Sequence, residues 1–271
     1  MHTTDTEVLI VGAGPTGTAL AIALQQAGVA HLLVDKLEQG QNTSRAAVIH
    51  AHTLEMLEEL GVSGELAKRG MKLANFVIRD RNRPLVQLRF DQLPSAYRYL
   101  LMLPQNETEK VLVERLAELG GSIQRGVTAT AATQDAESAR VTLQTPKGET
   151  MVKARYVVGG DGMHSVVRTA AGIDFEGGTY EESFVLADVR MQWSLGATEV
   201  SLFFSPAGVV VVAPLPDGAF RIVATLDNAP EQPGIADIQA LLDARGPTTG
   251  HNRIEEVVWS SRFRVHHRVA K

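Results

Sequence analysis

Three glycines near the amino terminus have the spacing of a nucleotide-binding loop. Gly12, Gly14 and Gly17, with Pro15 and Thr16 between the last two, form the pattern Gly-x-Gly-x-x-Gly. The first glycine permits a tight turn, the second lets a pyrophosphate approach the backbone, and the third lets a helix pack closely on a strand. The free N–H groups and partial positive charge of a helix N-terminus then favour phosphate. Alone, the loop is a weak signal, because glycine-rich turns also occur in other α/β folds.

The segments around the loop strengthen its interpretation. Residues 7–11 form a short aliphatic run, typical of a buried parallel strand, and residues 15–27 have the composition of a helix. A second predicted strand, residues 31–35, ends in Asp35, close to the ~20-residue spacing at which dinucleotide-binding folds carry a ribose-binding acid. The sequence therefore predicts a strand–helix–strand unit in which Asp35 accepts hydrogen bonds from the two ribose hydroxyls of an adenosine.

Composition excludes several other classes of protein. The 271 residues include 26 Lys and Arg against 31 Asp and Glu, a net charge of −5, which argues against a nucleic-acid partner. There is no cysteine, so disulfides, cysteine nucleophiles and thiolate metal sites are excluded. No apolar run approaches the ~20 residues of a membrane helix, and the first residues lack a secretory signal pattern. We therefore expect a cytoplasmic enzyme with no membrane partner.

Metal-dependent and serine hydrolase chemistry find little support. Two histidine pairs, His50 with His52 and His266 with His267, lack a third ligand at a recognisable spacing, and no His-Glu-x-x-His occurs. On a strand, His266 and His267 would face opposite sides. No Gly-x-Ser-x-Gly nucleophile elbow occurs either. We predict no metal site.

Three further segments resemble one enzyme family. Gly160-Asp161-Gly162 follows a predicted strand, and the run from Asp161 to Arg168 resembles the DGxxSxxR fingerprint of the class A flavin monooxygenases, the para-hydroxybenzoate hydroxylase family. Two other segments resemble the flavin-contacting arginine segment and the "PQ…E..L" segment of that family: Ser44-Arg45-Ala46, and Pro104-Gln105 followed by Glu109 and Leu112.

The resemblance implies FAD as cofactor and NAD(P)H as co-substrate. In the family, the aspartate that matches Asp161 serves both FAD and the nicotinamide nucleotide, and Gly162 shares its turn; from the residues alone, Asp161 is equally a helix N-cap. By the same resemblance, Arg45 reaches the ribityl chain or ring of the flavin and Gln105 bonds the ribityl chain. Without it, these two residues are an exposed loop arginine and a polar helix-start residue. Arg168 either anchors the loop of Asp161 or touches cofactor.

The activity implied by the resemblance is monooxygenation. NAD(P)H reduces FAD, the reduced flavin and O2 give a C4a-hydroperoxide, and its distal oxygen passes to an electron-rich aromatic or polyketide-like substrate. The protein supplies binding, orientation and exclusion of water, and we assign no catalytic residue. Two alternatives stay open: an FAD-dependent reductase of the same fold, and a non-catalytic, truncated FAD-binding fragment.

The expected fold is α/β, with a Rossmann-like FAD/NAD(P)-binding domain and an inserted, mostly antiparallel β-sheet substrate domain. We expect the FAD-binding domain at residues 1–74 and 101–178, the substrate domain at 75–100 and 179–262, and a return to the FAD domain at 263–271.

Local patterns give more detailed expectations. The capping-box form of Asn106–Glu109 predicts a helix from there to residue 119. A hairpin of residues 140–145 and 151–154 is expected to precede a separate strand at 156–158, and short strands are expected from about residue 177 onward.

The family pattern also has a part that this sequence does not show. In the family, the stretch that residues 263–270 resemble leads into a strand followed by Gly-Asp, whose aspartate contacts the FAD ribityl chain, and then a long helix. The sequence ends at Lys271, before either. We therefore expect these 271 residues alone to hold FAD weakly or not at all and not to turn over. For the oligomeric state, we expect a monomer or homodimer.

Overall fold

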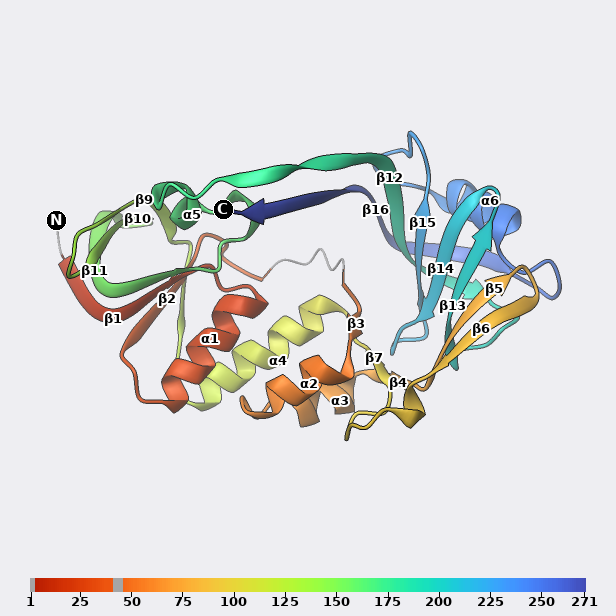
Figure 1. Ribbon diagram of the computed structural model, residues 1–271, viewed down its shortest axis with the longest axis horizontal. Coiled ribbons are helices and arrows are strands. Elements are labelled where there is room, and N and C mark those ends of the chain that lie inside the picture. The colour runs from red at the N-terminus through yellow and green to blue at the C-terminus, as the bar shows by residue number, and fades with distance from the viewer. Residues whose placement is uncertain (1–2, 41–45) are drawn as a thin grey trace.

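Two units, each built on a β-sheet, make up the structure, a computed structural model that describes residues 3–40 and 46–271. The first unit contains the N-terminal strand–helix–strand segment, and the second contains most of the chain after residue 175. A long two-stranded ribbon joins them along one side (Figure 1).

The sheet of the first unit has the strand order β8-β2-β1-β11-β10-β9. Strands β8, β2, β1 and β11 are parallel, whereas β10 and β9 continue the sheet antiparallel. Leu9 and Ile10 of the central strand β1 are fully buried, as the aliphatic run predicts. The bounds are β1 (Thr3–Val11), β2 (His31–Asp35), β8 (Ile123–Arg125), β9 (Thr128–Gln134), β10 (Ala139–Thr145) and β11 (Gly148–Gly159).

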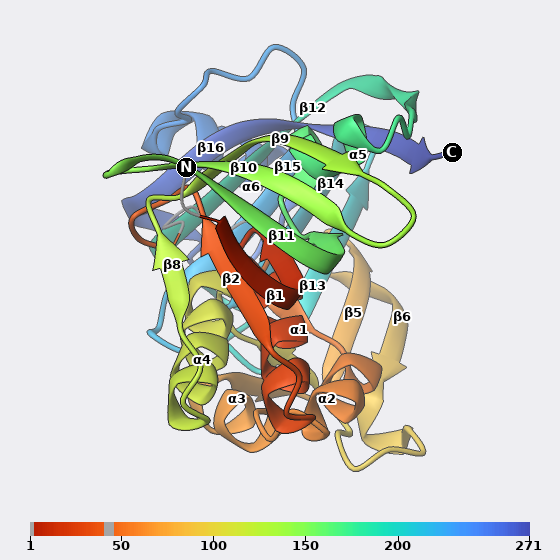
Figure 2. The same cartoon turned by 90° about the vertical axis from the view of Figure 1, so that its left-hand side faces the viewer.

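Helices α1 (Pro15–Gln26) and α4 (Gln105–Glu118) lie together on one face of this sheet (Figures 1 and 2). Their apolar sides share a core with two shorter helices, α2 (Ala51–Glu58) and α3 (Ser63–Arg69). A second apolar cluster joins Leu9 and Val34 to residues of β9, β10 and β11. Helix α5 (Val166–Ala170) follows β11.

The helix predicted from Asn106 is present as α4, but two details of the local predictions in this unit are wrong. Helix α4 begins at Gln105, one residue before the predicted start, because the Pro104 carbonyl already accepts the backbone N–H groups of Glu107 and Thr108. No side-chain cap forms there. The hairpin strand and the strand predicted at 156–158 are one strand, β11, because residues 148–154 pair with β10 while residues 151–159 pair with β1.

The second unit is a seven-stranded sheet with the order β16-β12-β15-β14-β13-β5-β6. All neighbours are antiparallel except β13 and β5. Helix α6 (Ile235–Arg245) covers one face and closes an apolar core with it. The bounds are β5 (Asn75–Asp80), β6 (Arg83–Arg89), β12 (Phe175–Gln192), β13 (Glu199–Ser205), β14 (Gly208–Pro214), β15 (Phe220–Thr225) and β16 (Arg253–Ala270).

Strands β12 and β16 correct the expectation of short strands, because each is 18 residues long. They pair with each other from Phe175–Ala270 to Gln192–Arg253, and an irregularity separates Thr179 from Ser183. Their outer halves form the ribbon that returns the chain to the first unit (Figure 1). The domain boundaries expected after residues 178 and 262 fall inside these continuous strands.

A small third sheet holds the two units together. Its strand order is β3-β7-β4, with bounds Val48–Ile49, Leu100–Met102 and Met71–Leu73. Leu100 and Met102 share a buried cluster with Ala213 and Leu215 of the second unit. Among the described residues, no helix combines the length and apolar character needed to cross a membrane.

Candidate functional site

A pocket of about 640 Å³ opens where β1, β2 and β11 end, the edge at which α/β sheets bind ligands. Most of the residues singled out from the sequence line it: Gly12, Gly14, Pro15, Thr16, Asp35, Gln105, Asp161 and Gly162. Gly17 is buried just behind the loop. Arg45 lies outside the described residues.

The glycine loop connects β1 to α1 and depends on close backbone contacts. Gly12 has φ +101°, a conformation that L side chains rarely adopt, and a Cβ there would overlap the carbonyl of Gly160. A Cβ on Gly17 would overlap the carbonyl oxygen of Gly12. At Gly14, the N-cap of α1, a Cβ would meet nothing within 4 Å. Gly12 and Gly17 are therefore required by backbone packing, whereas the space that a side chain would occupy at Gly14 is open.

Helix α1 presents its N-terminus at this loop. Pro15 is its first residue, where the missing N–H costs nothing. The other N–H groups of a first helical turn have no partner within the helix and attract anions. The buried Thr18, which sequence reasoning missed, fixes the loop by donating its hydroxyl to the Ala13 carbonyl at 3.1 Å.

Asp35 ends β2 and faces the same loop. Its Oδ2 accepts the Ala13 N–H at 2.6 Å and its Oδ1 accepts the Leu37 N–H at 2.8 Å. Each carboxylate oxygen has a second lone pair. Asp35 is thus held in place by the backbone and retains the capacity to accept ribose hydroxyls.

Asp161 follows β11, and the N–H of the preceding Gly160 donates to the Val11 carbonyl at 2.7 Å, which brings the two loops together. Asp161 Oδ2 accepts the N–H of Val166, the first residue of α5, at 2.7 Å. Ser165 is the N-cap of α5, so Asp161 supports that helix from outside the cap position. Asp161 Oδ1 is buried and has no hydrogen-bond partner among the described residues. A water or a ligand supplies the donor for such an atom.

Gln105 and Arg168 differ in their relation to the pocket. Gln105 lines it, and its Nε2 donates to Glu109 Oε1, also a lining residue, at 2.8 Å. Arg168 is not a lining residue. Its Nη1 donates to the Met163 carbonyl at 3.0 Å and its guanidinium lies 4.4 Å from the Phe175 ring centroid. Of the two roles open for Arg168, the contacts favour anchoring the loop.

Several lining residues carry no sequence signal. They include Leu37, Arg125, Val127 and Ala129. Arg125 ends the three-residue strand β8, and its Nη1 lies 3.9 Å from Asp35 Oδ1. The parallel register of β2 and β8 brings it there, a contact that only the folded sheet reveals.

The second histidine pair, His266 and His267, makes structural contacts. His266 Nδ1 lies 2.8 Å from Thr179 Oγ1, and the ring of His267 packs on Tyr180 at 4.9 Å. Among the described residues, no three His, Asp or Glu side chains gather as metal ligands would.

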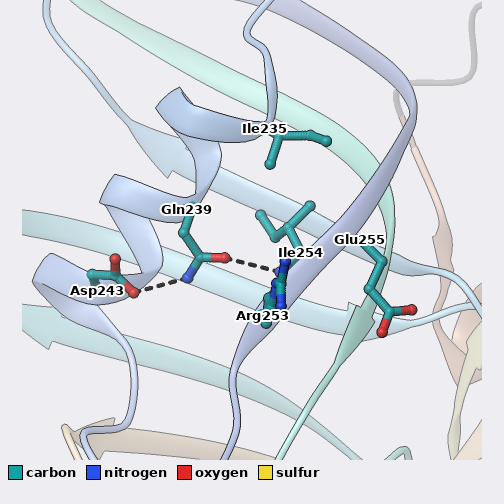
Figure 3. Close-up of a pocket in the computed structure, with 6 residues that line it drawn as sticks. All are labelled: Ile235, Gln239, Asp243, Arg253, Ile254 and Glu255. Carbon is teal, nitrogen blue, oxygen red and sulfur yellow. Dashed lines mark hydrogen bonds between the residues drawn. The ribbon is translucent and has the colours of Figure 1, made fainter.

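A second hollow lies between α6 and β16, and its lining residues connect the helix to the strand (Figure 3). Gln239 spans it: its side chain donates to Asp243 Oδ1 and to the Asn252 carbonyl and accepts the Ile254 N–H. Its amide is thereby fully engaged in tying the helix to the strand.

The residues of the first pocket fit FAD. The helix N-terminus suits a pyrophosphate, Asp35 suits a ribose, and the partnerless Oδ1 of Asp161 suits a hydroxyl donor.

Comparisons with known proteins agree with this fit. The FAD binding domain family matches residues 5–271. Pentachlorophenol 4-monooxygenase of Sphingobium chlorophenolicum is 30% identical over 98% of this chain and 51% of its own length. The 6-methylpretetramide 4-monooxygenase of Streptomyces rimosus is 33% identical over 81% of this chain and 40% of its own. The chain thus spans about half the length of these relatives.

Solved structures give the same answer. The p-nitrophenol 4-monooxygenase of Pseudomonas putida DLL-E4 superposes with a TM-score of 0.86 at 25% identity, over 100% of this chain and 70% of that one. The anhydrotetracycline hydroxylase of Streptomyces rimosus gives 0.77 at 30% identity, over 99% and 54%. The expected fold class is confirmed. The chain belongs to the FAD binding domain family, and the relatives that it matches include aromatic monooxygenases.

Proposed function

We propose that the natural protein, meaning the whole gene product that contains these residues, is an FAD-dependent monooxygenase. It hydroxylates an aromatic or polyketide-like substrate with NAD(P)H and O2. The observation that carries the proposal is the pocket at which the N-terminus of α1, Asp35 and Asp161 converge. By their names, the relatives act on pentachlorophenol, 6-methylpretetramide and anhydrotetracycline, which supports this substrate class.

The proposal gives each part of the pocket a role. Gly12, Gly14 and Gly17, with Pro15 and Thr16, hold the pyrophosphate at the start of α1, and Asp35 binds the adenosine ribose. Gln105, Asp161 and Gly162 lie toward the ribityl chain and the flavin, where Arg45 is also assigned.

The second unit is proposed to form the substrate wall. Leu186, Val223 and Val211 form one cross-strand row, on the face opposite the core that α6 covers. Val211 packs in the cluster that includes Leu100 and Met102, so this face is turned toward the small third sheet. An apolar wall there suits an aromatic ring and keeps water from the reacting atoms.

When bound, FAD supplies hydride acceptance and O2 activation. The chain's own task is to bind it, orient its ring toward the substrate and exclude water. Its pocket-lining carboxylates, Asp35, Glu109 and Asp161, are placed to accept hydrogen bonds from cofactor hydroxyls.

The proposal is tested on the purified natural protein with a panel of phenols and polyketide-like aromatics. We expect stoichiometric FAD, substrate-stimulated NAD(P)H oxidation, and a product whose new oxygen comes from isotopically labelled O2. NAD(P)H oxidation without oxygen insertion for any substrate would establish the reductase alternative. A natural protein that binds no FAD would contradict both the monooxygenase and the reductase assignment.

A further inference from the structure

Arg125 stands out among the lining residues because nothing in the proposed function uses it. It ends β8, directly beside Asp35 in the parallel register of β2 and β8. Its side chain is 24% exposed and lines the pocket, so it is confined but reachable.

The N–H donors of the Arg125 guanidinium make no hydrogen bond to the described residues. Its Nη1 lies 3.9 Å from Asp35 Oδ1, close enough for charge attraction but beyond a hydrogen bond. Asp35 is already held by the N–H groups of Ala13 and Leu37. Within residues 3–40 and 46–271, no hydrogen bond from the Arg125 side chain is formed. A guanidinium carries five donors and a flat face that stacks on rings.

The surroundings of Arg125 suit a flat, uncharged ring. Leu37, Val127 and Ala129 line the same pocket. The Val127 N–H donates to the Asp35 carbonyl at 2.9 Å and the Gly126 N–H to the Leu37 carbonyl at 3.4 Å, which keeps these residues next to Asp35. An adenine is joined to its ribose by one bond. If Asp35 binds the ribose, the adenine therefore lies within reach of Arg125.

We infer that Arg125 is a cofactor-binding residue whose guanidinium stacks on the adenine ring of FAD. This inference rests on the proposed function, because it requires FAD to occupy this pocket. It also assigns Arg125 to the adenosine half of the cofactor, so that ADP alone is sufficient to reveal its contribution.

The test measures the dissociation constants of FAD, by flavin fluorescence, and of ADP, by calorimetry, for the natural apoprotein and its variants. Arg125→Ala is expected to weaken both ligands about tenfold, the factor that about 1.4 kcal/mol gives. Arg125→Lys keeps the charge but loses the flat face, and is expected to recover only part of this affinity. Arg140→Ala is the matched control, because Arg140 is an exposed arginine of the same sheet paired with Asp135. It is expected to bind both ligands normally.

A second comparison separates direct contact from an effect through Asp35. In an Asp35→Ala background, Arg125→Ala is expected to weaken ADP severalfold again, because the stacking contact does not depend on Asp35. The factor is not expected to be the same, since the two side chains lie only 3.9 Å apart and such neighbours are coupled. If the effect disappears in that background, Arg125 acts only by positioning Asp35 and the inference is wrong. The inference also fails if Arg125→Lys binds ADP as tightly as the natural protein, because charge alone would then account for the effect, or if Arg125→Ala itself binds like the natural protein. A natural protein that binds neither FAD nor ADP would instead overturn the proposed function itself.

Discussion

At the scale of single residues, the glycine loop separates packing from ligand binding. Gly17 has no room for a Cβ, whereas a Cβ on Gly14 meets open space at φ −70°. We predict that Gly14→Val folds and keeps a melting temperature near that of the natural protein, but loses FAD because the side chain occupies phosphate space. Gly17→Ala is expected to disrupt the fold. Both are checked by circular dichroism melting and FAD titration, and a Gly14→Val protein with full FAD affinity would refute the loop assignment.

Asp35 gives a second residue-scale prediction. Asp35→Ala removes a carboxylate that we assign to the ribose and that also orients the loop through Ala13. Hydrogen bonds to a charged group contribute about 1.5–3 kcal/mol, so the FAD dissociation constant is expected to rise at least tenfold in a fluorescence titration. Asp5→Ala, at an exposed position near the start of β1, is the control. Equal affinity for the two variants would contradict the ribose role of Asp35.

At this scale, the sequence predicts pocket-lining residues where they belong to motifs of consecutive residues. Gly12, Asp35 and Asp161 could be identified because each belongs to a local motif. Arg125 could not, because its proximity to Asp35 depends on which strand lies beside β2. The partnerless oxygen of Asp161 could not be foreseen either, since it depends on how the loop packs.

At the scale of elements, a buried ion pair links two strands of the second sheet. Arg221 on β15 donates from Nε and Nη2 to the two oxygens of Asp188 on β12, each at 2.7 Å. Arg221 is only 3% exposed. Asp188→Ala leaves a buried cation without its carboxylate, so we predict a loss of about 3 kcal/mol of unfolding free energy in urea.

The exposed pair of Asp80 and Arg83 in the β5–β6 hairpin provides the control for that prediction. Asp80→Ala is expected to cost less than about 1 kcal/mol, because exposed ion pairs contribute little. Similar losses for Asp80→Ala and Asp188→Ala would show that the buried pair does not stabilise the sheet.

The turn between β9 and β10 makes a prediction about pH. The backbone N–H groups of Glu137 and Ser138, with Arg140, hold the pKa of Asp135 well below its usual range. A carboxyl whose pKa is lowered on folding stabilises the protein above its unfolded pKa of about 3.9, and this contribution is lost as the pH falls. The melting temperature of Asp135→Asn should therefore lie below that of the natural protein at about pH 6. The difference should shrink below about pH 4. A difference that does not change with pH would contradict this.

The elements that could be predicted are those whose sequence patterns are local, and the others depend on pairing between distant segments. Strand β1, helix α1 and strand β2 are recognisable because hydrophobic runs, glycines and an acid follow one another in sequence. The 18-residue lengths of β12 and β16 could not be read locally, because their polar outer halves are strands only by pairing with each other. Similarly, the capping-box pattern at Asn106 was overridden by Pro104, which starts α4 earlier.

At the scale of the whole molecule, two units share one task. The ribbon of β12 and β16 joins the two units along one side (Figure 1). The cluster around Leu100, Met102 and Ala213 packs the sheet of the second unit against the small third sheet. In the proposed function, one unit holds the cofactor and the other shapes the space beside it. The alternation of an α/β segment with a region of antiparallel strands was predictable from the sequence, but the connection by continuous strands was not.

The central claim is that this pocket holds FAD, and the most direct measurement is the flavin content of the purified natural protein. We predict the visible absorption of an oxidised flavin, one FAD per chain after release by denaturation, and chromatographic identity with FAD rather than FMN. The Gly14→Val variant, prepared alongside, should be folded and colourless. A natural protein that is folded yet colourless, and that does not quench flavin fluorescence when titrated with FAD, would contradict the account.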